Sequence, residues 1–176
     1  MKLKKGYIQV YTGNGKGKTT AAIGQAVRAA GFGLKTYFIQ FMKKYPYNEI
    51  KSLKSLKDFI EIEQFGSDEF IYKKISPSEV HKSKIKNGLN SALIKMKNGN
   101  FDLIILDEIL VSIYFELIKE QEVLKFIYEK PEFVELILTG RYCPESIIQK
   151  ADLVTEMKEI KHYYQNGIIS RKGIDS

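Results

Sequence analysis

The sequence predicts an α/β domain in which a mostly parallel sheet is covered by helices on both faces. Short apolar runs alternate with segments of helical periodicity, as in sheets whose strands are joined by crossover helices. The run Leu103-Ile104-Ile105-Leu106 lacks polar alternation, which indicates a strand buried on both faces. A glycine-rich stretch also separates the first predicted strand from the first predicted helix. Because the chain has 176 residues, we expect one domain spanning 1–176.

Five apolar runs are predicted to be strands, because each is bounded by polar turn residues. They are Tyr7–Tyr11, Thr36–Phe41, Phe59–Gln64, Leu103–Leu106 and Phe133–Leu138. Apart from the third of these runs, the region from Lys43 to Ser76 is rich in loops.

Helical periodicity predicts the elements that cover the sheet. The first helix is expected from Lys18 to Gly31, with glycine at the left-handed C′ position. A second is announced by Ser76-Pro77-Ser78-Glu79, in which serine caps, proline fits the first turn and glutamate completes a capping box. Its predicted core face is Ile85, Leu89, Ala92, Leu93 and Met96. Weaker helical signals cover Ile109–Lys119, Gln121–Lys130 and Pro144–Lys150.

Composition excludes several classes of protein. An apolar fraction of 44% and a charged fraction of 28% are typical of globular domains, not of disordered or collagen-like chains. No stretch approaches the ~20 apolar residues of a membrane span. The basic start leads directly into a strand without a signal-peptide cleavage pattern, and the lone Cys143 has no internal disulfide partner. We therefore expect a cytoplasmic protein without a membrane partner.

The net charge of +7 raises the question of nucleic-acid binding. The basic residues are almost all lysines that alternate with Glu and Asp along the chain, and the only arginines are Arg28, Arg141 and Arg171. Solvated helix faces explain most of this charge, so no nucleic-acid partner is expected.

The glycine-rich stretch has the residues of a phosphate-binding loop. It runs Gly13, Asn14, Gly15, Lys16, Gly17, Lys18, Thr19, Thr20, between a predicted strand and a predicted helix. Glycines let successive backbone N–H groups point at an anion, and the helix N-terminus adds about half a positive charge. Lys18 supplies a cation and Thr19 a hydroxyl for Mg²⁺. Thr12 stands where the usual pattern begins with glycine, yet the remaining glycines predict a tight loop and hence a three-layer P-loop NTPase (RecA-like) fold.

A carboxylate near that hydroxyl is needed for a magnesium site. Asp107 and Glu108 directly follow the buried run at 103–106, so they are expected at the ligand-binding edge of the sheet. Thr19, Asp107 and Glu108 are therefore the candidate metal ligands. Acidic residues also favour helix N-termini, so capping of the helix at Ile109 is an alternative role that is compatible with the first.

A longer pattern around the loop resembles one family, the P-loop ATP:corrinoid adenosyltransferases of vitamin B12 metabolism. The matching segments extend from the loop almost to the end of the chain. They are Thr12–Gly24, Arg28–Gly33, Gln40–Lys43, Leu106–Glu108, Leu138–Arg141, Ala151–Met157, Lys161–His162 and Gly173–Asp175. Ordinary kinases and GTPases share only the loop and the acidic strand end, so this ordered set is more specific than the loop alone.

The resemblance implies transfer of the 5′-deoxyadenosyl group of ATP to the cobalt of a reduced corrinoid, with Mg²⁺ as cofactor. Lys18, Thr19 and Glu108 are then the expected catalytic residues, and Arg28 is expected to contact ATP. A helix-surface charge is the alternative for Arg28. The resemblance also implies a homodimer and a flavoprotein that donates electrons to cobalt.

Three further residues are assigned to the corrinoid by the same resemblance. Phe70 and Tyr72 fall where similar transferases carry a Phe-x-Trp segment that packs under the corrin ring, although Tyr72 replaces the usual tryptophan. Ordinary hydrophobic packing is the alternative for this pair. Arg141 is expected to face ATP or the corrinoid, with capping of the next helix as its alternative.

Two other classes of protein share the loop and stay open from sequence alone. A phosphoryl-transfer or hydrolytic NTPase would align water or a hydroxyl group on the γ-phosphate. A RecA-like protein would instead bind single-stranded nucleic acid with a steep dependence on salt. The nature of the products and the need for a corrinoid distinguish the transferase from both.

Overall fold

A computed structural model describes residues 3–44, 47–66 and 77–175. Its described strands form one parallel sheet with the spatial order β3-β2-β4-β5-β1-β6. The strands are β1 (Ile8–Thr12), β2 (Thr36–Phe41), β3 (Ile60–Phe65), β4 (Leu103–Asp107), β5 (Glu135–Thr139) and β6 (Leu153–Glu156). Because all of them run in the same direction, their carboxyl ends meet at one edge of the sheet.

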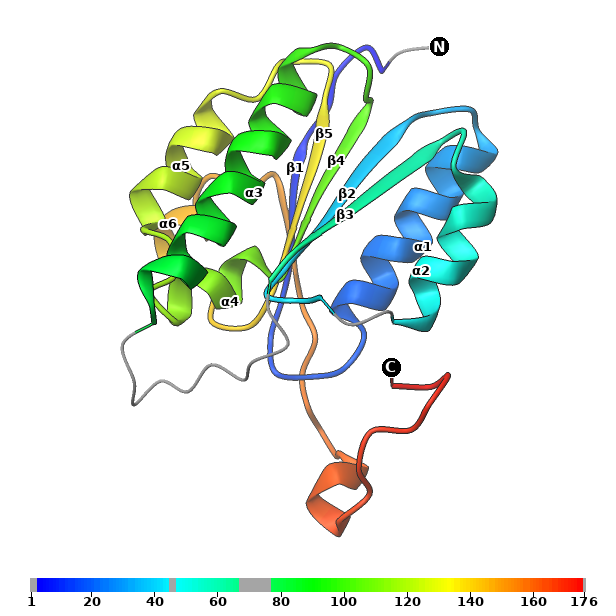
Figure 1. The fold of residues 1–176 in the computed structure, drawn as a ribbon, viewed down its shortest axis with the longest axis vertical. Coiled ribbons are helices and arrows are strands. Elements are labelled where there is room, and N and C mark those ends of the chain that lie inside the picture. Colours follow the sequence, from blue (N-terminus) through cyan, green and yellow to red (C-terminus); the bar gives the residue numbers. More distant parts are fainter. Residues whose placement is uncertain (1–2, 45–46, 67–76, 176) are drawn as a thin grey trace.

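The helices form one layer on each face of this sheet (Figure 1). One layer contains α1 (Lys18–Gly31) and α2 (Asn48–Leu53), which continues into a short 3₁₀ helix, Lys54–Leu56. The other contains α3 (Glu79–Lys97), α4 (Ile109–Tyr114), α5 (Glu120–Tyr128) and α6 (Glu145–Ile148). This arrangement confirms the predicted three-layer α/β fold. None of the described helices combines the length and the apolar composition that a membrane span requires.

The core lies on both sides of the central strands. Every residue of β2 and of β4 is buried, and successive side chains of one strand point to opposite faces. In β2, Tyr37 and Ile39 therefore pack in the cluster that includes α3 and α5, whereas Phe38 packs in the cluster that includes α1. Burial on both faces explains why the central strands lack polar alternation.

The five predicted strands are confirmed: Thr36–Phe41 matches β2 at both ends, and the ends of the other four differ by at most two residues. The structure adds β6, which pairs with β1 in the register Gln9 to Leu153. Every residue of β6 is exposed, so β6 lacks the apolar run that identifies a buried strand. It also adds α2 in the loop-rich region, and it ends the helix at Ile109 earlier than predicted, at Tyr114.

Two predicted helix caps were wrong by two residues. Gly31 belongs to α1, and Gly33 instead adopts the left-handed conformation (φ 90°), with its N–H donating to the carbonyl of Ala30 at 2.9 Å. The N-cap of α3 is Ser78, whose hydroxyl accepts from the backbone N–H of His81 at 3.3 Å. A capping box with Glu79 would require Ser76 as the cap, three residues earlier, and Ser76 lies outside the described residues.

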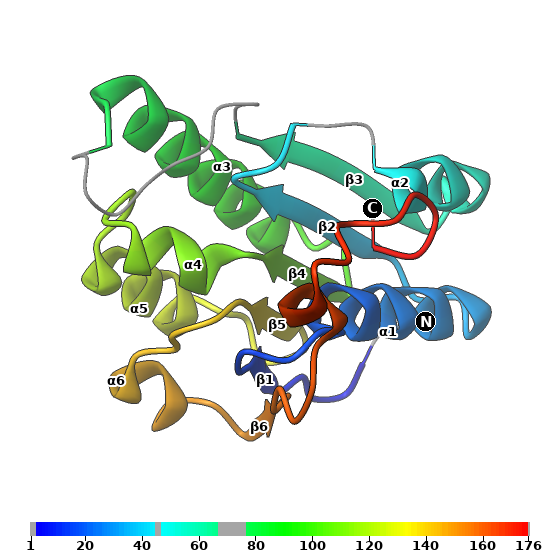
Figure 2. The same ribbon diagram turned by 90° about the horizontal axis from the view of Figure 1, so that it is seen from below.

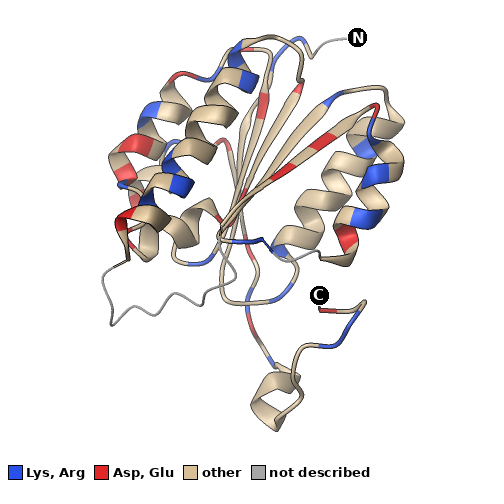
Figure 3. Ribbon diagram, viewed as in Figure 1, with Lys and Arg blue, Asp and Glu red and all other residues tan. Residues whose placement is uncertain are grey.

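Charged residues of both signs are interspersed on the helices of the two layers (Figure 3). Several pair across elements: Lys86 with Glu122 at 3.1 Å and Lys95 with Glu61 at 2.5 Å. Such pairs account for part of the lysine content without a polyanionic partner. The absence of a nucleic-acid partner stays a prediction.

The carboxyl edge of the sheet gathers several parts of the chain that are distant in sequence. Figure 2 looks onto this edge, where the loop before α1, the ends of the central strands and the segment after β6 (residues 157–175) lie together. That segment contains a short 3₁₀ helix, Tyr163–Asn166. The edge is therefore the part of the molecule in which a site can be assembled.

Packing of α3 on the sheet requires glycine at position 88. A Cβ atom there would lie 2.8 Å from Cγ of Phe65 and 2.9 Å from Cε1 of Phe41. We expect Gly88→Ala to lower the free energy of unfolding by roughly 1–3 kcal/mol, because the helix must move away from the sheet. A Cβ atom added at Gly24 of α1 would meet no atom within 4 Å. Gly24→Ala should therefore raise the free energy of unfolding by about 0.4–1 kcal/mol. Urea unfolding measures both, and equal stabilities would contradict the close packing of α3.

Candidate active site

The loop between β1 and α1 is held in a tight turn by the segment after β6. Gly13 and Gly17 have left-handed backbone (φ 94° and 118°), which favours glycine. A Cβ atom at Gly15 would lie 2.7 Å from the carbonyl oxygen of Met157, and the Gly15 N–H donates to that oxygen at 2.6 Å. The predicted tight loop is therefore present despite Thr12, whose carbonyl accepts from the Met157 N–H at 2.8 Å.

Lys18 places its ammonium group inside this turn. The side chain is buried, and Nζ donates to the carbonyl oxygens of Gly13 at 2.7 Å and Gly15 at 2.6 Å. Burial, followed by the charge of Arg141, lowers the pKa of Lys18 below its ordinary value, while Glu108 and Asp107 oppose that shift. The loop thus positions one cation among its own carbonyl groups.

Asp107, at the end of β4, joins the loop to the sheet. Its carboxylate is fully buried and accepts hydrogen bonds from several elements. The donors are Thr139 Oγ1 at 2.7 Å, Thr19 Oγ1 at 2.8 Å, Lys43 Nζ at 2.9 Å and Gln40 Nε2 at 3.3 Å. Lys43 Nζ also lies 3.3 Å from Thr19 Oγ1. A cationic group therefore already contacts both the hydroxyl and the carboxylate that the sequence assigns to a metal.

Glu108 occupies a left-handed position (φ 65°) immediately after Asp107. Its backbone N–H donates to Thr139 Oγ1 at 3.0 Å, which fixes the turn out of β4. Burial and the neighbouring carboxylate of Asp107 raise the pKa of Glu108, and the charges of Lys43 and Lys18 act in the opposite direction. The side chain makes no capping hydrogen bond to α4. Glu108 is therefore held as an acidic group among cations.

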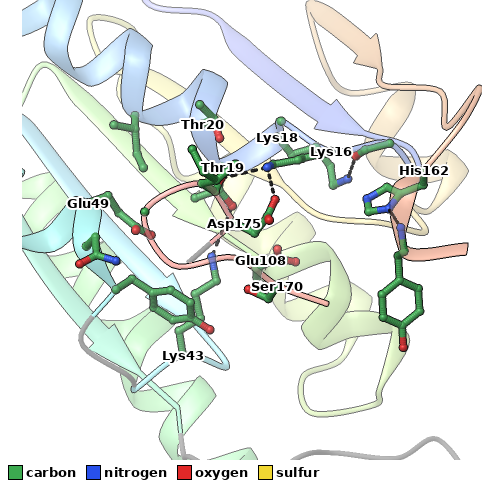
Figure 4. Close-up of a pocket in the computed structure, with 18 of the residues that line it drawn as sticks. Lys16, Lys18, Thr19, Thr20, Lys43, Glu49, Glu108, His162, Ser170 and Asp175 are labelled. Atoms are coloured by element: carbon green, nitrogen blue, oxygen red, sulfur yellow. Dashed lines mark hydrogen bonds and ion pairs between the residues drawn. The ribbon is translucent and has the colours of Figure 1, made fainter. Parts of the chain in front are cut away.

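These residues line a cavity of about 730 Å³. Figure 4 shows that its labelled side chains converge from the loop, the turn after β2, the end of β4 and the segment after β6. The lining includes Gly15–Thr20, Ile23, Lys43, Tyr47–Glu49, Ser52, Glu108, Arg141, His162–Tyr164, Ile168, Ser170 and Gly173–Asp175. The volume is within the range of small-molecule sites, and the walls combine several cations with apolar side chains.

Comparison with known proteins then decides the family. Residues 4–176 match the family described as ATP:corrinoid adenosyltransferase BtuR/CobO/CobP. The chain belongs to this family. It is 32% identical over 173 residues to the corrinoid adenosyltransferase of Escherichia coli K12, covering 98% of this chain and 86% of that protein. It is 30% identical over 173 residues to corrinoid adenosyltransferase CobA of Salmonella typhimurium, with the same coverage.

The structure gathers some of the predicted site residues in the cavity and not others. Loop residues 15–20 line the cavity together with Glu108 and Arg141, and Asp107 lies beneath them. Arg28 is exposed in the last turn of α1 and is not among the lining residues. A contact of Arg28 with ATP therefore stays a prediction. Phe70 and Tyr72 lie outside the described residues.

Sequence reasoning did not assign Lys43, Tyr163 or Asp175 to the site, although the structure places all three in the cavity wall. Lys43 comes two residues after β2, and the left-handed Met42 (φ 58°) turns the chain between them. Its position after a central strand is a signal that could have identified it. Asp175 is 159 residues from its partner Lys16, and no local pattern indicates that distant pairing.

Thr139 stabilises the site by bonding both Asp107 and the turn at Glu108. We expect Thr139→Val to lower the free energy of unfolding by about 1–3 kcal/mol, because the isosteric side chain leaves a buried carboxylate with one donor fewer. Thr36 is a matched control, since its buried Oγ1 has no hydrogen-bond partner in the described structure. Thr36→Val should therefore be neutral or stabilising. Thermal unfolding compares the two, and an equal effect would contradict the role of Thr139.

Proposed function

We propose that this chain transfers the 5′-deoxyadenosyl group of ATP to the cobalt of a reduced corrinoid and releases inorganic triphosphate. The observation that supports this proposal most directly is the cavity lined by loop residues 15–20, in which Thr19 is hydrogen-bonded to Asp107. Family membership supports this reaction among those that such a loop can serve. The loop then binds a leaving group, in contrast to kinases, in which it holds a phosphoryl group that is transferred.

The chemistry defines what the protein must supply. The electron pair of cobalt(I) attacks C5′ of the ribose, the C5′–O bond breaks, and its electrons leave with triphosphate. Cobalt(I) is a strong nucleophile, so the step requires no general base to activate it. The site must instead hold C5′ in line with cobalt and stabilise the charge of triphosphate as it leaves.

Residues of the loop are suited to stabilising the charge of triphosphate as it leaves. The backbone N–H groups of the glycine turn and the N-terminus of α1 favour an anion. Lys18 is already fixed at the centre of the turn by two carbonyl groups, and its exchange toward a phosphate oxygen requires only a change of partner. Arg141 and Lys43 line the same cavity. We infer that these cations stabilise triphosphate more strongly than they stabilise bound ATP.

The residues present also fit Mg²⁺. Among the described residues, no group of three His, Cys, Asp or Glu side chains is placed to share a metal, but Mg²⁺ commonly takes one or two carboxylates together with water and phosphate oxygens. The Lys43 ammonium already bridges the oxygens of Thr19 and Asp107. We propose that Thr19 and Asp107 hold Mg²⁺, with Glu108 bound directly or through water. The ion would neutralise charge on the triphosphate.

A substitution series at Thr19 tests this assignment. Thr19→Ser keeps the hydroxyl group, whereas Thr19→Val keeps the shape and loses the oxygen. We expect Thr19→Val to require a several-fold higher Mg²⁺ concentration for half-maximal activity, and Thr19→Ser to behave like the wild type. Initial rates over a Mg²⁺ titration provide the measurement. An identical Mg²⁺ requirement in all three proteins would remove Thr19 from the metal site.

An anaerobic assay with reduced cobalamin, ATP and Mg²⁺ tests the reaction itself. Loss of the cob(I)alamin spectrum should accompany formation of adenosylcobalamin and triphosphate in equal amounts. ADP and phosphate formed without corrinoid would instead indicate an ordinary NTPase. Lys18→Ala should lower kcat/KM on the order of 10²–10³-fold, the usual cost of one charge-stabilising donor. Lys35→Ala, an exposed lysine just before β2, is the control and should retain activity.

The proposal includes the partners that the family resemblance implies. They are a second copy of the chain in a homodimer and a flavoprotein that reduces cobalt(II) to cobalt(I). Arg141, two residues after β5 and in the cavity wall, is assigned to ATP or the corrinoid. Replacing the chemical reductant in the assay with a reduced flavoprotein tests the electron donor.

A further inference from the structure

The segment after β6 folds back over the phosphate loop and forms one wall of the cavity. It begins with the contact between Met157 and Gly15 and returns to the loop at Ile174 and Asp175. Figure 4 shows Asp175 and Lys16 within the same cavity wall. The function proposed above uses Lys18 and Thr19 but assigns no role to this second contact.

Lys16 is fully engaged by that segment. Its Nζ donates to the carbonyl oxygen of Ile174 at 2.9 Å and to Tyr163 Oη at 3.2 Å, and it forms an ion pair with Asp175. The hydrogen bonds to Asp175 and Tyr163 raise the pKa of Lys16, so it stays protonated. An ammonium group has three N–H donors. A phosphate oxygen can therefore bond Lys16 only by replacing one of these three acceptors.

Asp175 does not depend on Lys16 for its position. The carboxylate also accepts from Tyr163 Oη, from the backbone N–H of Arg171 at 3.0 Å and from Arg171 Nε at 3.1 Å. The Arg171 guanidinium in turn lies 4.6 Å from the centre of the Tyr163 ring. The segment therefore builds its own anion-holding cluster, which keeps the carboxylate in place when Lys16 changes partner.

We propose that Asp175 sets the affinity of the site for polyphosphate by competing with a phosphate oxygen for Lys16. The proposal rests on the proposed function, in which the loop binds triphosphate. Like a phosphate group, the carboxylate is negatively charged and offers oxygen acceptors. It is already bonded to Lys16, the lysine of the loop that faces the segment after β6. Binding then exchanges one acceptor for another at Lys16, and the release of triphosphate returns Lys16 to Asp175.

Binding of inorganic tripolyphosphate to the full chain, without corrinoid, tests the competition. Asp175→Asn keeps the shape of the side chain but removes its charge, so the Kd should fall about two- to fivefold, the range expected for one partly exposed ion pair. Lys16→Ala should raise the Kd. In the Lys16→Ala background, Asp175→Asn should have no further effect, because its competitor for Lys16 is gone.

Two control variants separate direct competition for Lys16 from the general electrostatic effect of removing a negative charge near the site. Glu159→Gln removes the same charge from the same segment, where Glu159 accepts from Gln165 at 2.8 Å, and it should leave the Kd within a factor of about 1.5. Asp175→Glu should bind like the wild type. An unchanged or raised Kd in Asp175→Asn, or an equal fall in both Lys16 backgrounds, would overturn the proposal. Loss of binding in Asp175→Asn would show that the carboxylate positions Lys16, which also overturns it.

The same titration distinguishes this proposal from the proposed function. If Lys18→Ala binds tripolyphosphate as tightly as the wild type, the loop is not the polyphosphate site and both proposals fail. If Lys18→Ala loses binding while Asp175→Asn binds like the wild type, the phosphate-loop assignment stands and only the competition at Lys16 fails.

Discussion

The buried carboxylate of Asp107 is the interaction on which the site depends. It accepts hydrogen bonds from α1 through Thr19, from β5 through Thr139 and from the turn after β2 through Lys43. A carboxylate with no exposed surface requires such donors, because burial of an unpaired charge is strongly unfavourable. Satisfying Asp107 therefore fixes the relative positions of three elements at the carboxyl edge, and the cavity forms where they meet.

A second constraint acts from the opposite side on the loop between β1 and α1. The parallel strand β6 extends the sheet next to β1 and delivers Met157 to the loop. The backbone of Met157, the residue after β6, bonds both Thr12 and Gly15, so the loop is held by the end of a strand whose own residues are all exposed. The segment that includes β6 and Met157 therefore shapes the site through backbone hydrogen bonds and adds little to the apolar core.

The sequence was most informative where one local rule decided the structure. Buried strands such as 103–106 are recognised because both faces are apolar. The tight loop before α1 is recognised because its glycines occur in one order between a strand and a helix. Exposed β6 was missed because edge pairing imposes no apolar pattern. The caps at Gly31 and Ser76 were misplaced because neighbouring residues, Gly33 and Ser78, satisfy the same rules.

Site residues that act through distant contacts were harder to predict. Asp107 could be placed because parallel strands bring their carboxyl ends together. The same rule places Lys43 once β2 is known to pair with β4, the strand that ends at Asp107. Pairing of Lys16 with Asp175 depends on the path of the segment after β6. That path has no periodicity and few buried side chains, so only the three-dimensional structure reveals the pairing.

Three lysines of the cavity share a property that bears on how a polyphosphate would bind. Lys18 is held by loop carbonyls, Lys43 by Asp107 and Lys16 by Asp175. Each would bond a phosphate oxygen in exchange for an existing acceptor, so the net gain is the difference between two hydrogen-bonded states. This difference is smaller than the attraction of unpaired charges. Under the proposed function, a smaller gain is an advantage, because triphosphate must dissociate after each turnover. Binding that is tighter in the transition state than in the ground state raises the rate, whereas uniformly tight binding does not.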